Sequence, residues 1–164
     1  MFKNYIFDFG QVIVRFDPVY MTKQYIESEE DIKLVSEVVF DRLYWDRLDE
    51  GTITDEEVKS EICKRLPENL HKNAILAYEN WYMNIPSIEG MKELILSLKN
   101  EGKKLFILSN ISIGFAENYH KNNIVKELFD LFDGKIFSAK VGLTKPHADI
   151  FEFLLDKYDL KAEL

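Results

Sequence analysis

The sequence predicts an α/β fold in which a parallel sheet carries a helical insertion. Two continuous apolar runs, Tyr5–Phe7 and Leu105–Leu108, have the composition of strands buried on both faces. After Ile85 such runs alternate with helical patterns, which indicates parallel strands joined by right-handed helical crossovers. The stretch from Asp17 to Tyr82 shows helical patterns and no strand pattern. We therefore interpret it as a small helical bundle inserted into the α/β unit.

The helical stretch contains recognisable start and stop signals. Ser28 precedes three acidic residues, which is typical of a capped helix start. Gly51 breaks the pattern, and Thr54 with Glu57 forms a capping box that opens the next helix. A third helix is predicted over His71–Trp81. These signals divide the insertion into several short helices.

The remainder of the chain supplies the other elements of the α/β unit. Apolar residues from Met91 to Leu98 follow helical spacing, and Gly102 marks the end of that helix. A short strand is predicted over Lys135–Ser138. Further helices are predicted at Phe115–Tyr119, at Val125–Phe129 and from Ile150 to Leu155.

Composition excludes several classes of protein. The chain has 164 residues, 46% of them hydrophobic and 30% charged, which is typical of one globular domain. Its net charge of −8 and the absence of a basic patch argue against a nucleic-acid partner. The single Cys63 cannot form an intrachain disulfide, and no Cys/His cluster has zinc spacing. No apolar run approaches the roughly 20 residues of a membrane span, and the N-terminus lacks a signal-peptide cleavage pattern. We expect a soluble, cytoplasmic protein without a membrane partner.

Polar side chains follow the predicted strands at the points where the strands end. Asp8 follows the first strand, Ser109 and Asn110 follow the second, and Lys145 lies in a loop just after the third. Each residue taken alone also has a purely structural explanation. Asp8 could cap a loop, Ser109-Asn110 could form a turn, and Lys145 could be a solvated lysine. Because carboxyl ends of parallel strands meet at one sheet edge, we expect all of them to converge there. A carboxylate nucleophile, small polar groups and an ammonium group form a plausible phosphoryl-transfer site.

The sequence resembles the haloacid dehalogenase-like hydrolase superfamily, in particular bacterial sugar-phosphate phosphatases of the α-glucose-1-phosphate phosphatase type. The matching segments are Tyr5–Val12, Phe106–Asn110 and Gly142–Pro146, in the family's order and with its separation. The resemblance covers essentially the whole chain. It implies a Rossmann-like core formed by residues 1–16 and 84–164, with a helical cap over residues 17–83.

The resemblance also implies a role for each site residue. Asp8 would form an aspartyl-phosphate and bind Mg²⁺ through one oxygen, and the carbonyl of Gly10 would be a second metal ligand. Ser109 and the amide of Asn110 would bind the phosphoryl group, and Lys145 would pair with Asp8 and the phosphate oxygens. The cap would close over the substrate and exclude water. The implied activity is that of a Mg²⁺-dependent phosphatase acting on a small phosphorylated metabolite, in particular a sugar phosphate.

The sequence departs from the family pattern in two places. Many superfamily phosphatases have a second aspartate two residues after the nucleophile as general acid and base, and here that residue is Gly10. The proton-transfer role then falls to another group, to water or to nothing, and slow turnover is expected. The family's acidic pair after a further strand is also absent, which suggests a longer parent protein whose C-terminal strands are missing here. Tyr5–Phe9 would then be an open sheet edge, and the chain would bind Mg²⁺ weakly and self-associate.

Two other functions remain open at this point. A 2-haloacid dehalogenase would use the same aspartate to attack carbon without a metal, although Phe9-Gly10-Gln11 looks more like the phosphatase branch. A truncated or inactive domain with a binding role is the other alternative. Among further candidates, Trp45 and Trp81 either pack the cap or line the pocket. Two interpretations are open for three residues at the cap hinge, Arg15, Asp17 and Arg47. They either contact a sugar or take solvated or salt-bridged positions.

Overall fold

The sheet has three parallel strands in the order β1-β2-β3. The computed structural model describes residues 3–161. The strands are β1 (Asn4–Phe7), β2 (Lys104–Ser109) and β3 (Gly134–Phe137). Phe7 pairs with Ile107, and Ser109 pairs with Phe137, so the carboxyl ends of the strands lie at one edge of the sheet. The predicted α/β class is confirmed.

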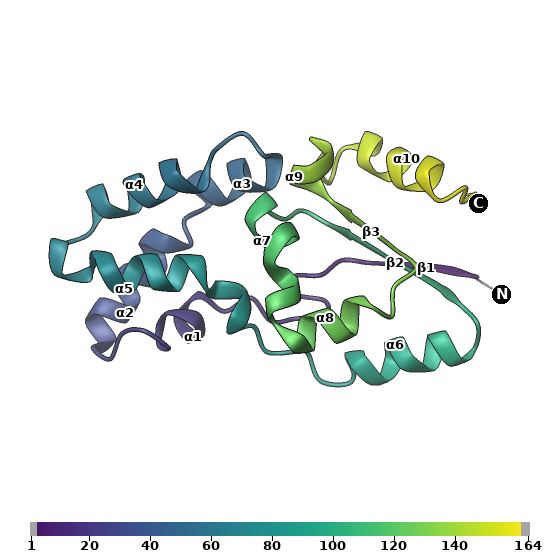
Figure 1. Ribbon diagram of the computed structural model, residues 1–164, viewed down its shortest axis with the longest axis horizontal. Coiled ribbons are helices and arrows are strands. Elements are labelled where there is room, and N and C mark those ends of the chain that lie inside the picture. Colours follow the sequence, from purple (N-terminus) through teal and green to yellow (C-terminus); the bar gives the residue numbers. More distant parts are fainter. Residues whose placement is uncertain (1–2, 162–164) are drawn as a thin grey trace.

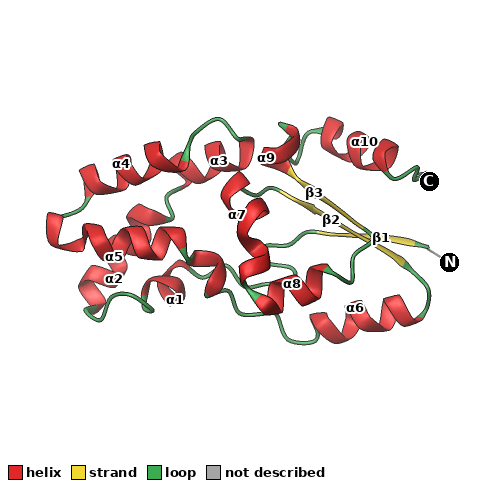
Figure 2. Cartoon of the chain, viewed as in Figure 1, coloured by secondary structure: helices red, strands yellow, loops and turns green. Residues whose placement is uncertain are grey.

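Helices surround this sheet and form a separate lobe at its carboxyl edge (Figure 1). The helices of this helical lobe are α1 (Pro18–Thr22), α2 (Glu29–Val39), α3 (Arg42–Glu50), α4 (Asp55–Arg65) and α5 (Glu68–Glu79). The remaining helices are η1 (Trp81–Met83), α6 (Met91–Asn100), α7 (Ile113–Asn118), η2 (Tyr119–Lys121), α8 (Asn123–Phe129), α9 (Ser138–Val141) and α10 (Ala148–Lys157). Figure 2 shows the helical lobe as helices and loops, with the strands confined to the other half. The boundaries of the predicted cap at residues 17 and 83 stay a prediction.

The two faces of the sheet are covered by different helices. On one face Phe106, Leu108 and Ile136 pack with Ile150 and Leu154 of α10. The opposite face belongs to the larger hydrophobic cluster, to which α6 and α8 contribute. In Figure 1, α10 lies on one side of the strands, with α6 and α8 on the other. Strand β2 is therefore buried on both faces, as its apolar run predicts.

The prediction that the first strand is also buried on both faces is wrong. Ile6 is 46% exposed, and its partner in the ladder is Phe106, so both side chains lie on the face of the sheet that α10 covers. Helix α10 packs on β2 and β3 and leaves Ile6 uncovered. Within residues 3–161, β1 pairs with β2 alone and is a sheet edge. Self-association through this edge stays a prediction.

The capping signals are confirmed. The Ser28 hydroxyl accepts a hydrogen bond from the Asp31 N–H, and Thr54 and Glu57 form the reciprocal capping box of α4. Gly51 ends α3 in a left-handed conformation with φ of 72°. The third predicted helix begins earlier than expected, at Glu68, because Pro67 already provides its start.

Ser138 connects the helical lobe to the sheet half through hydrogen bonds of its hydroxyl group. This residue was predicted to end the third strand but instead opens α9. Its buried hydroxyl donates to the carbonyl of Asp49 at 2.5 Å and accepts from the Ile111 N–H at 2.9 Å. Close by, a Cβ added at Gly51 would lie 3.1 Å from the Ala139 carbonyl oxygen, so a glycine permits the close approach of α3 to α9.

No helix within residues 3–161 has both the length and the apolar character needed to cross a lipid bilayer. The predicted cytoplasmic location stays a prediction.

Candidate active site

Asp8 and Lys145 meet at the carboxyl edge of the sheet, although they are far apart in the sequence. Lys145 Nζ lies 2.7 Å from Asp8 Oδ2, and the other carboxylate oxygen accepts a hydrogen bond from the Phe9 N–H at 2.8 Å. The Asp8 side chain is 42% exposed and that of Lys145 is 20% exposed. A pair this exposed adds at most about 1 kcal/mol to stability. Its main consequence is the orientation of a carboxylate toward the solvent-facing edge of the sheet.

Asn110 holds the loop that carries Lys145. Its side-chain Oδ1 accepts from the Lys145 N–H at 2.8 Å, and its Nδ2 donates to the Lys145 carbonyl at 2.9 Å. The end of β2 is thereby tied to the lysine loop at two points. The neighbouring Ser109 is buried and, like Asn110, lines the cavity beside Asp8. The structure thus brings together all the residues that the sequence predicts for this site.

The tie between Asn110 and Lys145 can be tested by removing the amide. In Asn110→Ala the Lys145 backbone loses both hydrogen bonds, so the ammonium group is held less well against Asp8. We expect the turnover of the enzyme to fall by about 10- to 100-fold, because small errors in positioning have effects of this size. Asn118→Ala is the control, since Asn118 also bonds a carbonyl through its amide but lies outside this cavity. Equal activity of the two variants would contradict the positioning role of Asn110.

Gly10 lies in a tight turn between β1 and the helical lobe. The N–H groups of Ile13 and Val14 both donate to the Phe9 carbonyl, and Gln11 has a φ of 59°. A Cβ added at Gly10 would meet no atom within 4 Å. The position beside the nucleophile candidate is therefore open space, without a side chain that could transfer a proton.

The predicted site residues line a cavity of about 310 Å³, within the size range of small-molecule sites. Its lining combines three groups of side chains. The first is the predicted site: Asp8, Gly10, Ser109, Asn110 and Lys145. The second is aromatic: Phe16, Phe40, Trp45 and Trp81. The third is the charged face of α3: Arg42, Asp46 and Asp49.

The aromatic side chains form a mutually packed wall. The Phe16 ring centroid lies 5.3 Å from that of Trp45 and 5.6 Å from those of Phe40 and Trp81. Trp45 Nε1 donates to the Val39 carbonyl at 2.8 Å, which fixes the orientation of this indole. Trp45 and Trp81 pack against neighbouring rings and also line the cavity, so both of their predicted roles are observed.

The charged face of α3 is the part of the site that the sequence reasoning missed. Arg42, Asp46 and Asp49 follow helical spacing and share one face of the helix, which is the signal that could have found them. Arg42 pairs with Asp46 at 2.8 Å. The pKa of Asp49 is raised to about 7, mainly by burial and in smaller part by repulsion from Asp46.

The hinge residues singled out from the sequence lie elsewhere. Arg15, Asp17 and Arg47 line neither of the cavities described here. The Asp17 carboxylate caps α1 by accepting from the Tyr20 N–H at 2.9 Å. Its position is therefore explained by helix capping.

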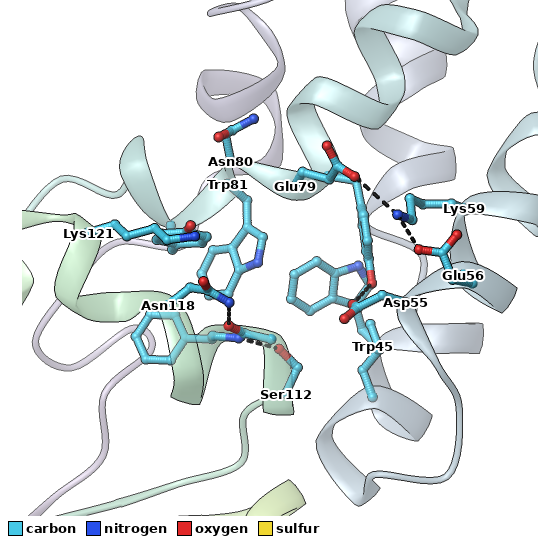
Figure 3. A pocket seen from close by; sticks show the side chains of 15 residues that line it. Trp45, Asp55, Glu56, Lys59, Glu79, Asn80, Trp81, Ser112, Asn118 and Lys121 are labelled. Atoms are coloured by element: carbon cyan, nitrogen blue, oxygen red, sulfur yellow. Dashed lines mark hydrogen bonds and ion pairs between the residues drawn. The ribbon is translucent and has the colours of Figure 1, made fainter.

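A second cavity, of about 390 Å³, shares Trp45 and Trp81 with the first, and Figure 3 shows the side chains that line it. Several of its polar side chains are paired with one another: the Tyr78 hydroxyl donates to Asp55 at 2.5 Å, and Lys59 pairs with Glu56 and Glu79. Trp45 and Trp81 line both cavities. The predicted catalytic, substrate-binding and metal residues, Asp8, Gly10, Ser109, Asn110 and Lys145, line the smaller cavity and not this larger one, so the candidate chemistry belongs to the smaller one.

The residues at the site offer oxygen donors suited to magnesium. Mg²⁺ prefers carboxylate and carbonyl oxygens, takes one or two of them from the protein and fills its other positions with water and substrate phosphate. Asp8 carries carboxylate oxygens of this kind, Gly10 lines the same cavity, and their role as metal ligands stays a prediction. Residues 3–161 contain no group of three or more His, Cys, Asp or Glu side chains that could hold a metal ion. The donor set therefore fits a magnesium ion held jointly with a phosphorylated ligand.

These features define an α/β protein with its candidate active site at the sheet edge, beneath a helical lobe. A family model for haloacid dehalogenase-like hydrolases matches residues 2–164, and the chain belongs to this family. The resemblance inferred from the sequence motifs and the prediction of a hydrolase are thereby confirmed.

Comparison with individual proteins gives relatives of two kinds. A sesquiterpene phosphatase of Aspergillus oryzae, astK, is 23% identical over 161 residues, which cover 98% of this chain and 76% of the relative. A haloacid dehalogenase family enzyme of Bacteroides thetaiotaomicron, solved with magnesium and inorganic phosphate, has a TM-score of 0.64 at 20% identity, with coverage of 96% and 79%. L-2-haloacid dehalogenase of Xanthobacter autotrophicus has a TM-score of 0.66 at 17% identity, with coverage of 99% and 67%. The two structural likenesses establish the fold.

Proposed function

We propose that the protein is a Mg²⁺-dependent phosphatase that hydrolyses a small phosphorylated metabolite through an aspartyl-phosphate on Asp8. The observation that carries this proposal is the 2.7 Å pair between Lys145 and Asp8 at the edge of the cavity. An oriented carboxylate beside a fixed ammonium group is what attack on a phosphoryl group requires. The similarity to a sesquiterpene phosphatase supports the same activity.

Each residue then has a distinct part in the reaction. The Asp8 carboxylate attacks phosphorus, and the Lys145 ammonium offsets the negative charge of the phosphoryl oxygens. The Ser109 hydroxyl holds one of these oxygens. Because the Asn110 side chain is bonded to the Lys145 backbone, we assign its backbone N–H to the phosphoryl group. Bound magnesium would neutralise charge on the phosphate, with Asp8 and the Gly10 carbonyl as its protein ligands.

The cavity also indicates the character of the organic group. The rings of Phe16, Phe40, Trp45 and Trp81 form an apolar part of the same cavity lining as Asp8 and Lys145. Both the apolar face of a sugar ring and a terpenyl chain can pack against such a wall. We therefore include a sugar phosphate and a terpenyl monophosphate in the substrate panel, with the sugar phosphate as the substrate suggested by the sequence motifs.

Removal of the metal is the direct test of the proposed cofactor. With magnesium we expect release of inorganic phosphate from at least one member of the panel. Chelation should lower the rate by about 100-fold or more, because a metal ion supplies several kcal/mol of charge stabilisation, and added Mg²⁺ should restore it. Phosphate release that is indifferent to chelation would contradict the magnesium dependence.

Dehalogenation is the second candidate, because the fold is also that of L-2-haloacid dehalogenase. It is distinguished by release of halide from a 2-haloacid without metal. Halide release without phosphate release would replace the proposed function. Release of neither product across the panel would favour a binding role.

A further inference from the structure

We infer that Asp49 is the general acid and base of this reaction, in place of the side chain that Gly10 lacks. The inference rests on the proposed phosphatase function and names a residue of the same site. Asp49 lies in the last turn of α3 and lines the cavity together with Asp8 and Lys145. It belongs to the helical lobe, whereas Asp8 and Lys145 belong to the sheet half.

The backbone of Asp49 is fixed to the sheet half of the molecule. Its carbonyl accepts the hydrogen bond from the buried Ser138 hydroxyl at 2.5 Å. Two residues further on, Gly51 lies against Ala139, with no room there for a side chain to be added without displacement. These two attachments hold this turn of α3 over the site, so Asp49 has a defined position relative to Asp8.

Among the residues that the structure describes, the Asp49 carboxyl differs from the neighbouring carboxyls because it has no partner. Asp46 is paired with Arg42, and Asp8 is paired with Lys145. Within residues 3–161 the Asp49 side chain has neither a hydrogen bond nor an ion pair. A half-buried carboxyl without a protein partner that lines a cavity is well placed to exchange a proton with a ligand.

The surroundings of Asp49 favour its protonated form near neutral pH. Burial is the main reason that its pKa rises to about 7, and the negative charges of Asp46 and Asp8 act in the same direction. The positive charges of Arg42 and Lys145 oppose them. General acids work best when their pKa lies near the working pH.

The proposed proton transfers balance over the two steps. In the first step an Asp8 oxygen bonds to phosphorus, the bond between phosphorus and the ester oxygen breaks, and the Asp49 proton moves to that oxygen to give the free alcohol. In the second step the Asp49 carboxylate takes a proton from water as the water oxygen bonds to phosphorus. The aspartyl–phosphate bond breaks, which releases inorganic phosphate and restores Asp8.

The test compares two esters that differ in their need for a general acid. An alkyl phosphate has a poor leaving group, whereas p-nitrophenyl phosphate has a good one that departs without protonation. We expect Asp49→Asn to lower kcat/KM for the alkyl ester by about 10²–10⁴-fold and for the aryl ester by less than about tenfold. The value of kcat/KM is compared because it ends at the first irreversible step and excludes hydrolysis of the aspartyl-phosphate.

Asp46→Asn is the matched variant on the same face of α3. It should not discriminate between the esters in this way, and it should move the alkaline limb of the wild-type pH profile to lower pH, because the repulsion that raises the Asp49 pKa is removed. Equal losses on the two esters in Asp49→Asn would overturn the role of Asp49 and leave the proposed function intact. If the wild type releases phosphate from neither ester, the proposed function fails and this inference fails with it.

A measurement without substrate or magnesium provides an independent readout. The folded-state pKa of Asp49, about 7, is above its ordinary value of 3.8, so folding favours the protonated group. Its contribution to the free energy of unfolding is fully present below about pH 4 and is lost as the pH rises to about 7. Asp49→Asn should lack this loss and be at least as stable as the wild type at pH 8. An identical pH dependence in both proteins would overturn the inference.

Discussion

Asp8→Asn is expected to reduce phosphate release by at least about 10⁴-fold, the scale of loss seen when a nucleophile is removed. The amide can still accept the hydrogen bond from the Phe9 N–H through its oxygen. It cannot attack phosphorus as a carboxylate does, and it loses the ion pair with Lys145. The measurement is the initial rate of phosphate release with magnesium at saturating substrate.

Thermal unfolding of the same variant separates chemistry from folding. Asp8 is substantially exposed and its ion pair contributes little to stability, so the midpoint should change by no more than a few degrees. A folded Asp8→Asn protein that keeps near-wild-type activity would exclude Asp8 as the nucleophile.

Phe115→Ala is expected to have the largest effect on stability, a loss of about 3–5 kcal/mol in the free energy of unfolding. Phe115 is buried where the two halves of the molecule meet. Its ring stacks on Trp81 at 5.3 Å and lies 5.1 Å from Phe9 and 6.1 Å from Phe129. Truncation removes these contacts and leaves a cavity that the surrounding rings cannot fill without moving. Urea unfolding, monitored by tryptophan fluorescence, would measure the loss in the free energy of unfolding.

Ile113→Ala is the control for this substitution, since Ile113 is on the same helix but is 43% exposed. A surface truncation of this kind should change stability by about 0.5 kcal/mol or less. Similar effects of the two substitutions would contradict the central position of Phe115 in the core. Because Trp81 also lines the cavity, Phe115→Ala should weaken substrate binding as well.

The convergence of the site could be predicted from the sequence because it follows from the topology alone. Asp8 and Ser109 each follow an apolar strand run, and parallel strands in register present their ends at one edge. The position of Lys145 could be predicted because its loop comes after the third strand in the sequence. The orientation role of the Asn110 side chain could not be predicted, because it depends on the path of the lysine loop in space.

Other features depend on packing between elements that are distant in the sequence. The apolar Tyr5–Phe7 run indicated burial on both faces, but the exposure of Ile6 depends on which strands α10 covers. Ser138 was interpreted as the end of a strand, whereas its bond to the Asp49 carbonyl belongs to the junction between the halves. The helical spacing of Arg42, Asp46 and Asp49 was overlooked, and only the structure shows that this charged face of α3 lines the site.

The central claim is that Asp8 becomes phosphorylated during turnover, and borohydride trapping tests it most directly. The protein is mixed with substrate and magnesium, quenched within a turnover, reduced with borohydride and analysed by peptide mass spectrometry. An acyl phosphate on Asp8 would be reduced to homoserine at position 8, and we predict this conversion only when a phosphate ester that the protein turns over is present. Phosphate release with unmodified Asp8 under these conditions, or with homoserine at another position, would contradict the account.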